Sequence, residues 1–158
     1  IGELLGIERI LDKISRLIKE KVKSKDKLFS EGLITAFLLY CVGSMTFVGA
    51  IEEGINNDKK LLYTKSLMDG VTSILLASSL GIGVLVSALP LLLFQSILTW
   101  GAFYFEGYLQ PDMITELSAV GGVLIMAISL NILEILKIKV SNLLPALLLI
   151  IPIYNLVN

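Results

Sequence analysis

The sequence of 158 residues contains no histidine and a single cysteine, Cys41. The chain therefore has no histidine-bearing metal site and no histidine proton relay, and it cannot form an internal disulfide. Charged residues are scarce as well, at 17% against about 25% in an ordinary soluble domain. Hydrophobic residues make up 55% of the chain, and the mean hydropathy is +0.84. This composition excludes a water-soluble globule and predicts a membrane protein.

Positive charge is concentrated near the start of the chain. The formal net charge is −1, which predicts no nucleic-acid partner. The region between Arg9 and Lys27 is nevertheless rich in lysine and arginine, and its apolar residues recur with the period of an amphipathic helix. We expect residues 1–27 to form a basic amphipathic helix on the cytoplasmic side that binds anionic lipid through residues 9–27. The alternative is a helix that packs on a partner or folds back as a hairpin.

The remaining residues, 28–158, predict an all-α fold, a polytopic bundle of transmembrane helices, some of them short or interrupted. Residues 70–105 carry no charge, and this stretch is too long for one crossing of about 20 residues. The glycines at Gly81 and Gly83 offer a natural break within it. Counting lysine and arginine in the loops places the N-terminal helix in the cytoplasm. The predicted spans are about 28–51, 67–80, 84–105, 114–136 and 142–157.

Glycines and acids lie next to each other in two of these regions. Gly43 and Gly49 lie in the first span, and we expect them, with Gly81 and Gly83, to interrupt helices. A broken helix exposes backbone carbonyls, which together with carboxylates can bind a cation or polar solute. The alternative is that the acids are interfacial and the small residues only pack helices. The candidate ligands and pathway residues are Ser44, Thr46, Glu52, Asp69, Thr72, Ser73 and Ser78.

Motifs for enzymatic chemistry are missing. The sequence has no Walker lysine, no dinucleotide loop and no set of Ser, His and Asp, and Cys41 lies in an apolar run. We therefore expect no cofactor, no metal and no catalysis. The leading hypothesis is a transporter or channel for an inorganic ion or small polar solute that works as a homo-oligomer. The alternatives are a membrane scaffold or regulatory subunit that binds a partner protein and, more weakly, an envelope enzyme that uses carboxylates.

Several short segments of the chain together form a recognisable pattern. They are residues 1–8, 29–36, 41–45, 48–54, 65–70, 77–83, 121–122 and 142–146. With these segments the chain resembles the YqgA/YdfK-like family of bacterial inner-membrane proteins, whose function is unknown. The resemblance implies a multi-pass protein of the bacterial cytoplasmic membrane, and it transfers no catalytic residue. It also implies that membrane helices of a full-length member precede Ile1, in keeping with a sequence that does not begin with Met.

Overall fold

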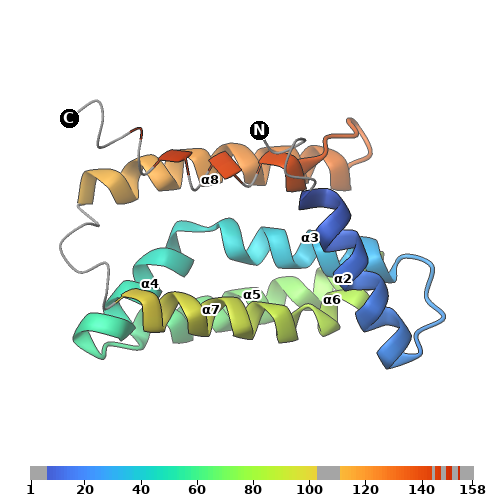
Figure 1. The fold of residues 1–158 in the computed structure, drawn as a ribbon, viewed down its shortest axis with the longest axis horizontal. Coiled ribbons are helices and arrows are strands. Elements are labelled where there is room, and N and C mark those ends of the chain that lie inside the picture. The colour runs from blue at the N-terminus through green and yellow to red at the C-terminus, as the bar shows by residue number, and fades with distance from the viewer. Residues whose placement is uncertain (1–6, 103–110, 144, 147–148, 151–152, 154–158) are drawn as a thin grey trace.

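A computed structural model describes residues 7–102, 111–143, 145–146, 149–150 and 153 (Figure 1). Within these residues the chain is helical and has no strand, so the predicted all-α fold is confirmed. The helices, in chain order, are α2 (Ile7–Val22), α3 (Phe29–Val42), α4 (Ser44–Asn56), α5 (Lys60–Leu80), α6 (Gly83–Val86), α7 (Ala88–Ala102), α8 (Pro111–Ile132) and the 3-10 turn η2 (Val140–Leu143).

Helix α3 lies in the middle of the molecule. Figure 1 shows it between α8 on one side and α5, α6 and α7 on the other, and α3 contacts all four. Because both sides of α3 are covered, its apolar residues do not form the single stripe of a surface helix. The cluster toward α8 contains Leu38, Val42, Leu124, Ala127, Ile128 and Val140, and the cluster toward α5 and α6 contains Ala36, Tyr40, Leu76 and Val84.

The predicted first span, residues 28–51, is two helices. α3 ends at Val42, Gly43 is extended, and the axis turns by 61° before α4 continues to Asn56. The chain thus breaks at Gly43, where the sequence analysis expects a break. The predicted break at Gly49 is wrong, because this residue lies inside α4. A Cβ at Gly49 would lie 2.7 Å from Cδ2 of Leu62, so the glycine allows α4 to approach α5 closely.

The second break separates α5 from α6. Gly81 has φ +76°, a conformation that favours glycine, and the next amide, Ile82 N, donates to Oδ2 of Asp26 at 3.1 Å. A Cβ at Gly81 would collide with the same carboxylate, and one at Gly83 would collide with the backbone carbonyl of Phe29. Asp26 therefore connects the loop before α3 to the break, 56 residues further along the chain.

Helix α5 begins well before the predicted span 67–80. The segment between the first two predicted spans is thus helical from Lys60 onward, and Asp58 accepts hydrogen bonds from the backbone and the side chain of Lys60 at the start of this helix. These contacts, with the backbone bond first, also lower the pKa of Asp58. Lys65 consequently lies on α5 rather than in a loop.

One continuous stretch of the described residues, Gly83–Ala102, is long and apolar enough to cross a membrane. The bent pair α3 and α4 would be a second if it counts as one span. At 1.5 Å per residue, 20 helical residues reach about 30 Å, the thickness of the hydrocarbon core. α6 and α7 meet at Ser87. Pro90 therefore lies in the first turn of α7, where a backbone N–H has no partner within its own helix and its absence costs little.

The last two predicted spans do not coincide with the helices that the structure describes. α8 ends at Ile132, before the predicted end at residue 136, because Asn131 turns the chain by bonding the backbone N–H and carbonyl of Ile138. The apolar part of α8 is Ser118–Ile132. The predicted span 142–157 falls largely outside the described residues, as does the end of the span 84–105.

Candidate functional site: a polar cavity between α3, α5, α6 and α7

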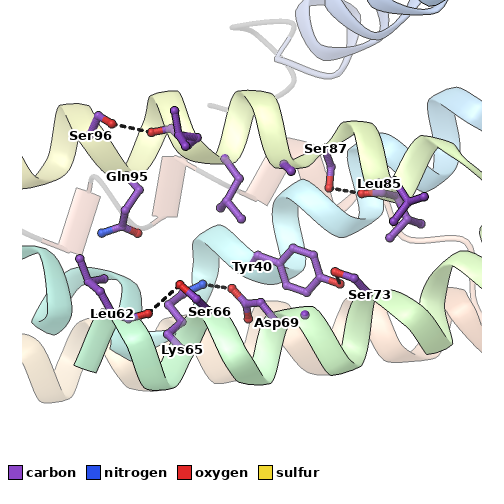
Figure 2. A pocket seen from close by; sticks show the side chains of 15 residues that line it. Tyr40, Leu62, Lys65, Ser66, Asp69, Ser73, Leu85, Ser87, Gln95 and Ser96 are labelled. Atoms are coloured by element: carbon purple, nitrogen blue, oxygen red, sulfur yellow. Dashed lines mark hydrogen bonds and ion pairs between the residues drawn. The ribbon is translucent and has the colours of Figure 1, made fainter. Parts of the chain in front are cut away.

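A cavity of about 460 Å³ lies between α5 and α7, with α3 and α6 forming the rest of its wall (Figure 2). Leucine and valine side chains make up much of the lining, but polar groups from three helices enter it. The polar lining residues are Tyr40 of α3, Lys65, Ser66, Asp69 and Ser73 of α5, Ser87 between α6 and α7, and Gln95 and Ser96 of α7.

Lys65 and Asp69 form an ion pair inside this cavity. They are four residues apart on α5, so their side chains lie on the same face of the helix. The Lys65 side chain is 10% exposed and that of Asp69 is 23% exposed. The ammonium group of Lys65 also lies 5.9 Å from the centre of the Tyr40 ring, within the range of a cation–π contact. The pair places one charge of each sign at the cavity wall.

Hydrogen bonds hold the wall of the cavity together. The Tyr40 hydroxyl and Ser73 Oγ share a hydrogen bond of 2.8 Å, which ties α3 to α5. Thr46, fully buried just after the break at Gly43, donates from Oγ1 to the Tyr40 carbonyl at 2.8 Å. Gln95 donates from Nε2 to the Thr46 carbonyl at 3.2 Å, which ties α7 to the same place. One of the last carbonyls of α3, that of Tyr40, is therefore satisfied by a side chain from beyond the break.

The structure brings some of the predicted residues together and separates others. Asp69 and Ser73 line the cavity, and Thr46 lies behind its wall. Glu52 does not line it: Glu52 is half-buried, and its carboxylate accepts a hydrogen bond from Asn56 at 3.0 Å. The side chain of Ser44 lies outside what the structure describes.

Thr72 and Ser78, which were expected to line the pathway, do not line this cavity. Both are exposed, and their hydroxyls donate to carbonyls of their own helix, those of Met68 and Leu75. For Ser78 the reason is helical phase. Residues 65, 69 and 73 are spaced by four and share one face, whereas position 78 lies on the opposite face.

Six polar lining residues are not among the candidates named from the sequence: Tyr40, Lys65, Ser66, Ser87, Gln95 and Ser96. For Lys65 a signal was available, since a lysine four residues before an aspartate at the start of an apolar run is the spacing of a helical ion pair. Tyr40 and Gln95 carry no such signal, because only the packing of α3 and α7 brings them to α5.

Among the residues that the structure describes, no three His, Cys, Asp or Glu side chains come close enough together to hold a metal ion. Cys41 is a free thiol and is buried in α3.

Comparison with known proteins identifies relatives of this chain. A family model described as "Protein of unknown function (DUF554)" matches residues 1–155. The chain is 40% identical over 150 residues to the uncharacterized membrane protein YdfK of Bacillus subtilis (strain 168), covering 94% of this chain and 64% of the relative. It is 35% identical over 158 residues to the uncharacterized protein YqgA of Escherichia coli (strain K12), covering 97% of this chain and 67% of the relative.

The chain thus spans about two thirds of the length of these two curated relatives. No solved structure matches it. The resemblance inferred from the sequence segments is confirmed, and the chain belongs to the DUF554 family of proteins of unknown function.

Proposed function

We propose that this chain is part of a multi-pass protein of the bacterial inner membrane that moves an inorganic ion or a small polar solute across the bilayer, as a transporter or channel. The membrane location is supported by the composition, by the apolar helix Gly83–Ala102 and by the name of the relative YdfK, which calls that protein a membrane protein. The five crossings predicted from the sequence are part of this proposal.

The observation that carries the proposal is the ion pair of Lys65 and Asp69 in a cavity of an otherwise apolar bundle. Asp69 lies inside the proposed span 67–80 and Lys65 lies two residues before it; charged groups within a membrane are costly, and they mark ion or substrate pathways. A buried ion pair also adds little stability compared with apolar residues of the same size. Its placement at a cavity wall is therefore better explained by a ligand than by folding.

The breaks at Gly43 and Gly81 support the same function. Non-helical backbone at membrane depth is tolerated where it is buried in protein or lines a cavity. The break at Gly43 is covered by Thr46 and by Gln95, and Gln95 also lines the cavity. Transporters bind their substrates where interrupted helices meet.

The surface of α2 supports the proposed orientation and lipid contact. Leu11 packs against the α3–α8 cluster, while Ile10, Ile14 and Leu17 are exposed. An exposed apolar row beside basic residues suits a helix at the headgroups of anionic lipid on the cytoplasmic side. Homo-oligomerisation is also part of the proposal.

We further propose that the chain is not an enzyme. Of the lining residues that the structure describes, Asp69 is the only acid, and it is paired with a lysine. The envelope-enzyme alternative relies on two carboxylates in acid and base roles, and the described lining of this cavity supplies one.

Flux measurements test the transport function. The full-length protein, reconstituted in liposomes, is assayed with Na⁺, K⁺, H⁺, small anions and labelled neutral amino acids. Asp69→Asn should abolish the flux that the wild type shows. Glu52→Gln is the matched control, because Glu52 lies on the neighbouring helix α4 but outside the cavity, and it should leave the flux unchanged.

Two outcomes would contradict the proposal. One is flux that Asp69→Asn and Glu52→Gln leave equally intact, which would remove the cavity from the pathway. The other is no flux of any of these solutes together with co-purification of a stable partner protein, which would favour the scaffold alternative.

A further inference from the structure

The charges of the cavity identify a class of ligand. Of the described lining residues, Lys65 and Asp69 are the charged ones, so the lining carries one positive and one negative group and no net charge. An inorganic cation bound here would face the Lys65 ammonium, and an inorganic anion would face the Asp69 carboxylate. Either ion would also leave one member of the pair without its partner, which is costly in a low dielectric.

A zwitterion avoids both penalties. Its carboxylate can bind the ammonium of Lys65 while its ammonium binds the carboxylate of Asp69, so that every charge keeps an opposite neighbour. Within the part of the chain that the structure describes, the pair joins Lys65 Nζ to Oδ2 of Asp69. Asp69 Oδ1 and further protons on Nζ therefore remain available to a ligand.

The rest of the cavity suits a compact ligand with an aliphatic part. Leu62, Leu85, Leu91 and Leu92 line it, and the amide of Gln95 lies across from α5 (Figure 2). A volume of about 460 Å³ lies toward the small end of the range of small-molecule sites.

We infer that the cavity binds a small zwitterion with an aliphatic side chain, of the neutral amino-acid class, with Lys65 holding its carboxylate and Asp69 its ammonium group. This inference rests on the proposed transport function and specifies its substrate.

Binding to the purified full-length protein tests the inference. The probes are tritiated L-leucine, L-valine and L-alanine, and the competitors are 4-methylpentanoate, which lacks the ammonium of leucine, and isopentylamine, which lacks its carboxylate. We expect saturable binding of at least one amino acid. Each singly charged competitor should bind about tenfold more weakly or worse, because it loses one charge-assisted hydrogen-bonding group. This comparison uses wild-type protein, so it does not depend on any variant folding.

Variants add a second readout. Asp69→Asn should weaken amino-acid binding by about tenfold or more and relieve the discrimination against 4-methylpentanoate, whereas Ser78→Ala, on the outer side of α5, should change neither. Absence of binding by all three amino acids, or competition by either singly charged analogue as strong as that of leucine, would overturn the inference. Ion flux that Asp69→Asn abolishes in a protein that binds no amino acid would overturn it and leave the proposed function standing.

Discussion

Replacing Lys65 by Met leaves the Asp69 carboxylate without its partner at the cavity wall. Removing one member of a fully buried pair costs about 3–5 kcal/mol, whereas an exposed pair contributes about 0–1 kcal/mol. The side chains of Lys65 and Asp69 are 10% and 23% exposed, which places the pair nearer the buried limit. We therefore expect Lys65→Met to lower the free energy of unfolding by about 2–3 kcal/mol, measured by equilibrium unfolding with dodecyl sulfate in mixed micelles.

The double variant Lys65→Met with Asp69→Leu separates stability from function. It removes both charges and fills their space with apolar side chains, so its stability should return to within about 1 kcal/mol of the wild type. Its flux in liposomes should nevertheless be lost. The reasoning is refuted if Lys65→Met costs less than about 0.5 kcal/mol, if the double variant loses as much stability as the sum of the single variants, or if the double variant still transports.

Other changes test other parts of the structure. Gly81→Ala should cost about 1–3 kcal/mol of unfolding free energy, because φ is +76° and the new Cβ meets a carboxylate; unchanged unfolding would contradict the break described at Gly81. Thr46→Val should cost about 1–2 kcal/mol in the same assay, because a buried carbonyl loses its hydrogen bond, and an equally stable variant would show that this bond does not hold the break. Replacing three basic residues of α2 by Gln should reduce the phosphatidylglycerol that co-purifies with the protein, as seen by native mass spectrometry, and unchanged lipid would rule out the proposed contact; these residues are Arg9, Lys13 and Arg16.

Local features of the fold were accessible to sequence reasoning. The helix of residues 7–22 follows the apolar period that the sequence displays, and the breaks at Gly43 and Gly81 follow from glycines inside apolar runs. Gly49 shows the limit of this argument. The same residue type within a helix serves close packing instead, and only the position of Leu62 on the next helix decides between the two roles.

The candidate site was accessible only in part, because it depends on packing between distant segments. Asp69 stands out as an acid beside an apolar run, and Ser73 follows it by one helical turn. The bond from Gln95 to the Thr46 carbonyl joins residues 49 positions apart, and that from Ile82 to Asp26 joins residues 56 positions apart. No local pattern encodes such contacts.

Transport of an ion or polar solute requires the cavity at Asp69 and Ser73 to open to water, and cysteine accessibility measures this directly. In a Cys41→Ala background, Ser73→Cys places a thiol in the cavity, and Thr72→Cys places one at the adjacent position, which is exposed and does not line the cavity. A membrane-impermeant methanethiosulfonate reagent applied to sealed liposomes should label Ser73→Cys and leave Thr72→Cys unmodified. A Ser73→Cys thiol that resists the reagent from both sides of the bilayer, or labelling of both thiols at equal rates, would contradict the account.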